Sequence, residues 1–170
     1  MIPAYVALGS NLNNPAQQLS SALNALSRLP ETSLTACSPA YRSTAVGPGQ
    51  QPDYLNAVAA LRTALAPLDL LHQLQDIEQA QGRERGERWG ARTLDLDILL
   101  YGNLVMDEDE LTIPHPRMRD RNFVLQPLHD LGATLSLPCG TLIASLLQHC
   151  PAGDLVLHGE LTVSSSFQEH

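Results

Sequence analysis

The chain has 170 residues, of which 44% are hydrophobic and 16% are charged. This apolar content is enough to form the core of one domain and argues against an intrinsically disordered chain. Its formal net charge of −8 disfavours a general binder of nucleic acid or of anionic membranes, and no apolar run approaches the roughly 20 residues that span a bilayer. Because residues 1–5 carry neither a basic region nor a cleavage signature, we expect no export signal and a cytoplasmic protein.

In the first half of the chain, apolar spacing and turn residues predict the order strand, helix, strand, strand. The predicted elements are a strand at 2–8 with a turn at 9–11, a helix from Pro15 to before Pro30, a strand at 33–42, a loop at 43–53 and a strand at 54–65. Asn14 is placed to cap the first helix, with Pro15 in its first turn. The turn at 9–11 lacks the Gly-x-x-x-x-Gly-Lys pattern of a phosphate loop, so we interpret it as structural.

The second half of the chain continues with a helix and a strand, followed by further helices. The predicted elements are a helix from Pro67 to a cap at Gly82, an arginine-rich loop at 83–93, a strand at 93–101, a turn at 102–103, helices near 117–131 and 141–149, and a frayed tail at 163–170. This order predicts the α+β class and a ferredoxin-like βαββαβ sandwich with extra C-terminal helices. We expect one domain over residues 1–162.

The cationic side chains are all arginines, because the sequence contains no lysine. A P-loop lysine, a Schiff-base lysine and a lysine general base are therefore excluded. Seven of the ten arginines lie between residues 83 and 121, so any phosphate group would be held there by guanidinium groups. The three cysteines, Cys37, Cys139 and Cys150, show no metal-type spacing, and we expect them to be buried free thiols.

The predicted strand at 93–101 carries two aspartates on one face. Asp95 and Asp97 alternate with the apolar residues Leu94, Leu96, Ile98 and Leu100. Their Cα atoms lie roughly 6.5–7 Å apart in a strand, where two carboxylates repel unless a cation lies between them. Mg²⁺ takes one or two protein carboxylates and completes its shell with water and phosphate oxygens. Two other interpretations stay open: a solvated polar face of an edge strand, and ion pairs with the preceding arginines.

The Arg-Trp-Gly-Ala-Arg-Thr-Leu-Asp-Leu-Asp block at residues 88–97 resembles the signature of the 6-hydroxymethyl-7,8-dihydropterin pyrophosphokinases. The resemblance covers about residues 4–130. It includes Ala-Leu-Gly-Ser-Asn-Leu at 7–12, Tyr-Arg at 41–42, Gln-Pro-Asp-Tyr-Leu-Asn at 51–56, Ile-Glu at 77–78, Ile-Pro-His-Pro at 113–116 and Arg-x-Phe-Val-Leu at 121–125. It implies a ferredoxin-like fold and transfer of the pyrophosphoryl group of ATP to the hydroxymethyl oxygen of the pterin, with two Mg²⁺ ions on Asp95 and Asp97.

Site residues follow from the same resemblance, position by position. It implies catalytic roles for Arg83, Arg92, Asp95 and Asp97. It implies ATP contacts at Leu71, Gln75, Glu78, Arg83, Arg92, Ile98, Thr112, His115 and Arg121. It implies pterin contacts at Thr44, Val46, Tyr54, Asn56, Trp89, Asp95 and Phe123. Without the resemblance, Tyr54 and Phe123 would be core aromatics, Gln75 and Glu78 solvated helix residues, and His115 an ordinary surface or core histidine.

The chain departs from the family pattern at a few positions. It has no lysine in the arginine-rich loop, and Ala91, Glu110 and Pro116 stand where some relatives have proline, arginine and tyrosine. Two rival functions remain open: a two-metal phosphohydrolase that uses the same carboxylates, and a non-catalytic ferredoxin-like binder of nucleotides or RNA, which the acidic charge disfavours. We expect a monomer with ATP and the pterin as small-molecule substrates, and neither a nucleic-acid nor a membrane partner.

Overall fold

The computed structural model describes residues 1–11, 14–43, 53–85, 94–150 and 155–161, without the side chains of residues 82–85. Its strands are β1 (Ile2–Ser10), β2 (Thr32–Cys37), β3 (Ala40–Ser43), β4 (Tyr54–Thr63), β5 (Asp95–Tyr101), β6 (Met106–Asp107), β7 (Thr112–Ile113) and β8 (Val156–Gly159). Its helices are α1 (Pro15–Leu26), α2 (Pro67–Arg85), the 3-10 turn η1 (Met118–Asp120), α3 (Asn122–Leu131) and α4 (Ile143–Gln148). Among the described helices, none combines the length and the apolar character needed to cross a bilayer.

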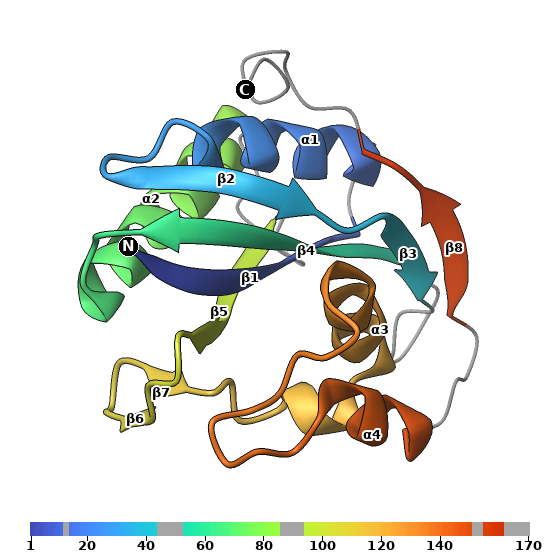
Figure 1. Cartoon of the computed structure of the whole chain (residues 1–170). Coiled ribbons are helices and arrows are strands. Elements are labelled where there is room, and N and C mark those ends of the chain that lie inside the picture. The colour runs from blue at the N-terminus through green and yellow to red at the C-terminus, as the bar shows by residue number, and fades with distance from the viewer. Residues whose placement is uncertain (12–13, 44–52, 86–93, 151–154, 162–170) are drawn as a thin grey trace.

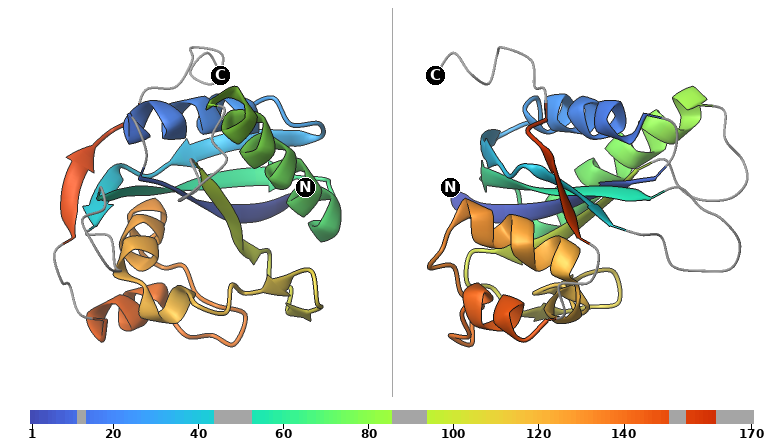
Figure 2. Two further views of the ribbon diagram at one scale, coloured as in Figure 1. Left: turned by 180° about the vertical axis from the view of Figure 1, so that it is seen from behind. Right: turned by 90° about the vertical axis from the view of Figure 1, so that its right-hand side faces the viewer.

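The described strands form a six-stranded antiparallel sheet with the order β5-β1-β4-β3-β8, and β2 pairs with β4 beside β3 (Figure 1). Helices α1 and α2 cover one face of this sheet, and α3 and α4 cover the other (Figure 2). The chain order β1, α1, β2 with β3, β4, α2, β5 is the predicted βαββαβ order. The predicted ferredoxin-like fold with extra C-terminal helices is therefore confirmed.

Side chains of β1 alternate between two hydrophobic clusters, one on each face of the sheet. Ala4, Val6 and Leu8 are buried in the cluster that contains the leucines of α1 and α2. Tyr5 and Ala7 face the second cluster, which contains Val58 of β4 and the apolar residues of α3. Strand β1 thus contributes side chains to both hydrophobic clusters, and the alternation of its residues determines which side chain faces which cluster. On the second face, Tyr41 of β3 donates a hydrogen bond to the carboxylate of Asp130 in α3.

The predicted strand at 33–42 is wrong in one respect, because it is two strands interrupted at Ser38 and Pro39. The Ser38 N–H donates to the carbonyl of Val58 at 2.9 Å, and the Ser38 hydroxyl accepts the Val58 N–H at 2.9 Å. One residue therefore satisfies both backbone groups of Val58, while Pro39 has no N–H to continue the ladder. The turn separates β2 from β3, and β3 then lies beside the β4 residues that line the site.

Several predicted helix ends are also corrected. Asn14 precedes α1 but has φ 53° and ψ 61° and makes no side-chain capping bond; its carbonyl accepts the Gln18 N–H at 3.1 Å instead. Helix α2 continues past Gly82 to Arg85, so the predicted cap is wrong. The region 117–131 is a 3-10 turn followed by α3, α4 is shorter than predicted, and β6, β7 and β8 were not predicted. The predicted tail at 163–170 lies outside the described residues.

The predicted alternation along 93–101 fails at its end. Leu100 lies opposite Tyr5 and Ile98 lies opposite Val6, so Leu99 is an extra residue in β5 relative to β1. Because of this irregularity, Leu99 and Leu100 are both buried in the cluster beneath α3. Leu100 therefore does not share a face with Leu94, Leu96 and Ile98, which are buried against α1 and α2.

The three cysteines are free thiols, as predicted, but they are not all buried. Cys139 is exposed, and Cys37 and Cys150 are partly buried. Burial, with a smaller contribution from Glu160, raises the pKa of Cys37 to about 12. A hydrogen bond with Thr141 is the main reason that the pKa of Cys139 is lowered to about 7, and Arg119 lowers it further.

Candidate functional site

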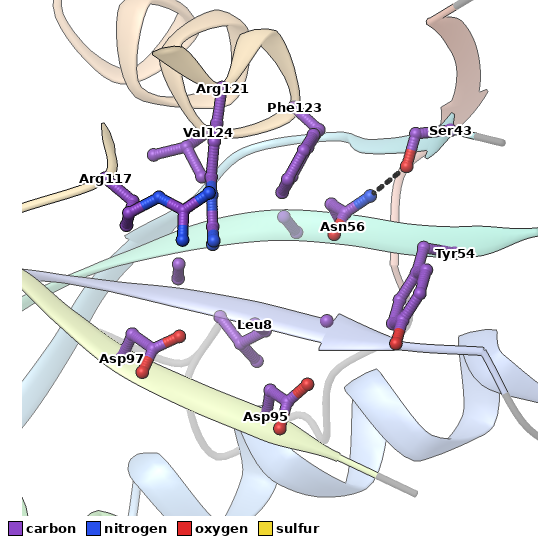
Figure 3. Close-up of a pocket in the computed structure, with 13 residues that line it drawn as sticks. Leu8, Ser43, Tyr54, Asn56, Asp95, Asp97, Arg117, Arg121, Phe123 and Val124 are labelled. Atoms are coloured by element: carbon purple, nitrogen blue, oxygen red, sulfur yellow. Dashed lines mark hydrogen bonds between the residues drawn. The ribbon is translucent and has the colours of Figure 1, made fainter. Parts of the chain in front are cut away.

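A pocket of about 560 Å³ lies between the sheet and the chain segment that leads into α3 (Figure 3). Strands β1, β4 and β5 form its floor, and η1 with the first turn of α3 forms its roof. The residues that line it are Ala7, Leu8, Gly9, Ser43, Tyr54, Asn56, Ala57, Asp95, Asp97, Arg117, Arg121, Phe123 and Val124. The pocket therefore combines acidic and amide groups on the floor with basic and aromatic groups above them.

Three neighbouring strands place Asn56, Gly9 and Asp95 in one row across the floor. Gly9 of β1 is paired with Asn56 of β4 on one side and with Asp95 of β5 on the other. A Cβ atom at position 9 would lie 3.1 Å from Oδ1 of Asn56. Since glycine has no side chain, the space between the amide and the carboxylate stays open. Ala7, one step along the same face, is likewise paired with Asp97 and adds only a methyl group.

The carboxylates of Asp95 and Asp97 both point into this pocket (Figure 3). Asp95 is half-buried and Asp97 is exposed. In the part of the chain that the structure describes, no group of three or more His, Cys, Asp and Glu residues could hold a metal ion. A hard divalent cation at these two carboxylates fits the donor set only if water and a bound ligand supply its remaining oxygens.

Glu78 of α2 supports the strand that carries the aspartates. Its Oε2 atom accepts the backbone N–H of Leu96 at 2.7 Å. Strand β5 is at the edge of the sheet, where N–H groups that point away from β1 have no strand partner. The carboxylate of Glu78 therefore satisfies the edge N–H that lies between Asp95 and Asp97 in the chain.

Two arginines lie on the roof opposite the aspartates, and His115 lies near their charges. The side chains of Arg117 and Arg121 both line the pocket and point from the roof toward the floor that carries Asp97 (Figure 3). Arg121 also covers the ring of Phe123, with Cζ 5.7 Å from the ring centroid. The Nδ1 atom of His115 accepts the backbone N–H of Arg117 at 3.2 Å, and the backbone N–H of His115 donates to the carbonyl of Leu99 at 3.1 Å.

Burial is the main reason that the pKa of His115 lies below its usual value. The positive charges of Arg121 and Arg117 lower the pKa further, and the negative charge of Asp97 opposes them. The neutral imidazole, with Nδ1 as an acceptor, carries its proton on Nε2. His115 therefore offers one N–H donor at the edge of the charged end of the site.

The other end of the pocket is polar and aromatic. Asn56 is only 6% exposed, and its Nδ2 donates to the hydroxyl of Ser43 at 3.0 Å. That bond fixes the amide plane and orients Oδ1 and the second N–H. Tyr54 and Phe123 are half-buried and line the same end, so both rings keep an accessible face. A flat heteroaromatic ligand with an amide-like edge fits these groups.

The structure brings together six of the residues that the resemblance assigns. Those that line the pocket are Tyr54, Asn56, Asp95, Asp97, Arg121 and Phe123. His115 lies beside them. Leu71, Gln75, Glu78, Ile98 and Thr112 do not line it, and Ile98 is buried against α1 and α2 with 2% exposure. Thr44, Val46, Trp89 and Arg92 lie outside the described residues, as does the side chain of Arg83 at the end of α2.

The sequence interpretation missed Arg117, Ser43 and the two small residues of β1 as parts of the site. Arg117 precedes Arg121 by four positions, but the segment was predicted as one helix, whereas the structure has a 3-10 turn between the two arginines, so the spacing did not show that both side chains enter the pocket. Ser43 stands directly opposite Tyr54 in the β3–β4 ladder, and only that pairing identifies it.

Comparisons with known proteins identify similar chains. Residues 5–133 match the family model described as 7,8-dihydro-6-hydroxymethylpterin-pyrophosphokinase. The 2-amino-4-hydroxy-6-hydroxymethyldihydropteridine pyrophosphokinase of Haemophilus influenzae is 53% identical over 148 residues, which cover 87% of this chain and 92% of the relative. The protein of the same name from Pseudomonas aeruginosa is 56% identical over 147 residues, which cover 86% and 91%.

Solved structures with the same fold include HPPK-DHPS in complex with substrates, with a TM-score of 0.69 and 14% identity. That match covers 87% of this chain and 45% of the other. Wild-type Plasmodium falciparum HPPK-DHPS gives a TM-score of 0.66 at 13% identity and covers 86% of this chain and 44% of the other. The chain therefore spans less than half the length of these two structures, and the likeness to them concerns the fold.

Proposed function

Because this chain belongs to the 7,8-dihydro-6-hydroxymethylpterin-pyrophosphokinase family, we propose that its pocket holds the pterin beside Asn56 and the phosphates of ATP between Asp95, Asp97 and the arginines. The chain is a pyrophosphokinase that transfers the pyrophosphoryl group of ATP to the hydroxymethyl group of the dihydropterin, in folate biosynthesis. The single observation that carries the site assignment is the row Asn56, Gly9, Asp95 across three strands.

The pterin end of the site rests on Asn56 and the two aromatic rings. Oδ1 of Asn56 accepts a hydrogen bond and its Nδ2 donates one, which suits the lactam and amine edge of a pterin. The rings of Tyr54 and Phe123 stack against the flat bicycle, each contributing about 0.5–1.5 kcal/mol. With its ring held there, the pterin directs its hydroxymethyl group across Gly9 toward Asp95. Thr44, Val46 and Trp89 are proposed to complete the enclosure.

The phosphate end rests on opposite charges that face each other. Asp95 and Asp97 hold two Mg²⁺ ions, and these ions supply charge neutralisation of the triphosphate when bound. Arg83, Arg92 and Arg121 donate hydrogen bonds to the phosphate oxygens, and the neutral His115 donates from Nε2. Gln75, Glu78, Leu71, Ile98 and Thr112 are proposed to surround the nucleotide, directly or by supporting β5. Catalysis then consists of placing the hydroxymethyl oxygen in line with the phosphorus and stabilising the charge that develops.

We also propose one domain over residues 1–162 that acts as a monomer in the cytoplasm. The support is that a single chain supplies both ends of the pocket and that the three thiols are free, as expected in a reducing compartment. Light scattering at working concentration tests the monomer, and a dimer mass would refute it.

The decisive experiment measures AMP formation with the pterin, ATP and Mg²⁺. Asp95→Ala and Asp97→Ala should each lower turnover by at least about 100-fold. Each substitution removes a carboxylate that is proposed to hold Mg²⁺, and the charge of that ion would stabilise the transition state. Asp109→Ala, which removes an exposed carboxylate outside the pocket, is the matched control and should behave like the unmodified enzyme. Retained turnover in both pocket variants would refute the metal assignment. Phosphate release that does not depend on the pterin would favour a phosphohydrolase instead.

A further inference from the structure

Arg117 has a place in the pocket that the resemblance did not assign to it. Like Arg121, it lines the pocket, and its side chain points from the roof toward the floor that carries Asp97 (Figure 3). Among the described residues, neither guanidinium takes part in an ion pair within 4 Å. Within the described part of the chain, the two arginines therefore line the same pocket as Asp97 without forming an ion pair with it.

Placing two guanidinium groups in one pocket costs free energy, because their charges repel. The local backbone fixes the position nevertheless. The Arg117 N–H donates to His115 Nδ1 at 3.2 Å, and the Arg117 carbonyl accepts the Asp120 N–H at 3.3 Å. The positive charges of Arg117 and Arg121 also both act on His115, because each of them lowers the pKa of that imidazole. A pair of cations held against repulsion, opposite a pair of carboxylates, is suited to an anion that carries several oxygens and its own divalent cations.

We propose that Arg117 is a phosphate-binding residue of this enzyme, which together with Arg121 holds the pyrophosphoryl group during its transfer. In that step the hydroxymethyl oxygen of the pterin forms a bond to the β-phosphorus of ATP and loses its proton to solvent, and the bond from that phosphorus to the oxygen of AMP breaks, so that AMP leaves. The proposal rests on the proposed function of the pocket and adds a residue to it. Donors from two guanidinium groups would reach its equatorial oxygens from the roof, while Asp95 and Asp97, which would hold the divalent cations, lie on the floor.

The test compares three variants of the full chain. Arg117→Ala removes the group, Arg117→Lys keeps the charge without the planar fork, and Arg119→Ala is the matched control. Arg119 lies two residues away in the same turn, is exposed, and directs its Nη2 to Cys139 Sγ at 3.8 Å instead of into the pocket. Arg117→Ala should lower kcat/KM for ATP by about 10- to 100-fold, with Arg117→Lys between it and the unmodified enzyme. Arg119→Ala should remain within about twofold.

A second measurement separates a structural role from a binding role. The KM for the pterin and the urea midpoint should stay unchanged in Arg117→Ala, because the Arg117 side chain is exposed and lies at the charged end of the pocket. Calorimetry with inorganic pyrophosphate and Mg²⁺ should show weaker binding to Arg117→Ala than to Arg119→Ala. Equal kcat/KM and equal pyrophosphate binding in these two variants would overturn the proposal.

The same design distinguishes failure of this inference from failure of the proposed function. If the unmodified chain forms no AMP with the pterin and ATP, the proposed function is wrong. The pyrophosphate titration still decides about Arg117 in that case, because it requires neither turnover nor the pterin.

Discussion

The carboxylate of Glu78 in α2 accepts the backbone N–H of Leu96 in β5 at 2.7 Å, and this bond joins the helix to the strand between the two aspartates. The resemblance assigned Glu78 to ATP, whereas its described contact is with the backbone of the edge strand. An edge strand held only by β1 on one side can shift or twist at its free side. The Glu78 bond therefore affects where both carboxylates point.

Replacing Glu78 by alanine leaves the Leu96 N–H without its acceptor. We expect Glu78→Ala to lower the free energy of unfolding by about 1–2 kcal/mol and to weaken Mg²⁺-dependent ATP binding. Urea unfolding and calorimetry with an ATP analogue measure the two effects. Gln79→Ala, an exposed neighbour in α2, is the control and should change neither. An unchanged unfolding midpoint in Glu78→Ala would show that the bond does not support the strand.

Gly9→Ala should disturb the pterin end of the site more than it disturbs stability. The new methyl group would lie 3.1 Å from Oδ1 of Asn56, so the amide must move by a few tenths of an ångström. A misplaced positioning group is costly, and we expect pterin affinity to fall about tenfold. In an Asn56→Ala background, Gly9→Ala should have little further effect, because the clashing oxygen is gone. Additive losses in the double variant would contradict this mechanism.

The titration of His115 tests the electrostatics of the roof in the metal-free protein. Burial and the two arginines lower its pKa, so its NMR midpoint should lie below the ordinary value of 6.5. Arg121→Ala should raise that midpoint, and Asp97→Asn should lower it. The unfolded chain takes up the proton at the higher pKa, so stability attributable to His115 is lost as the pH falls from 6.5 toward the folded pKa. His115→Gln should remove that part of the acid dependence, and a midpoint above 6.5 would contradict the geometry.

Cys139 and Cys37 should react very differently with an alkylating reagent. The pKa of Cys139 is about 7, so a large fraction is thiolate at neutral pH, whereas the pKa of Cys37 is about 12 and its thiol stays protonated. Site-resolved mass spectrometry after brief iodoacetamide treatment should find Cys139 modified first. Thr141→Val removes the hydrogen bond that lowers this pKa most and should shift the pH profile of labelling upward. Similar labelling rates at both cysteines would contradict this prediction.

The charge pattern of β5 and the order of the elements were predictable from the sequence because each depends on local periodicity. Asp95 and Asp97 share a face as predicted, since the two-residue period of a strand holds over that part. Leu100 was misplaced because the irregularity at Leu99 lies in the pairing of β5 with β1, and nothing in the alternation of 94–100 reveals it. The short strands β6 to β8 were missed for a similar reason, as two to four residues give no measurable period.

The site was predictable to the extent that short motifs carry it. Asn56, Asp95 and Phe123 lie far apart in the chain, and only the resemblance grouped them before the fold was known. Arg117 was missed because its direction depends on η1, a turn whose faces cannot be read from spacing. Ile98 shows the opposite error, because the resemblance assigned it an ATP contact although it is buried. The two-residue period of the strand that turns Asp97 toward the pocket turns Ile98 toward α1 and α2, where it is 2% exposed.

The row formed by Asn56, Gly9 and Asp95 also sets a length. Neighbouring strands lie about 4.8 Å apart, so two such steps separate the backbones of the amide and the carboxylate by about 9.6 Å. Main-chain hydrogen bonds fix these steps, and almost any amino acid can make them. The core can therefore change its side chains extensively while the reach from Asn56 to Asp95 stays constant, which agrees with a shared fold at 14% identity.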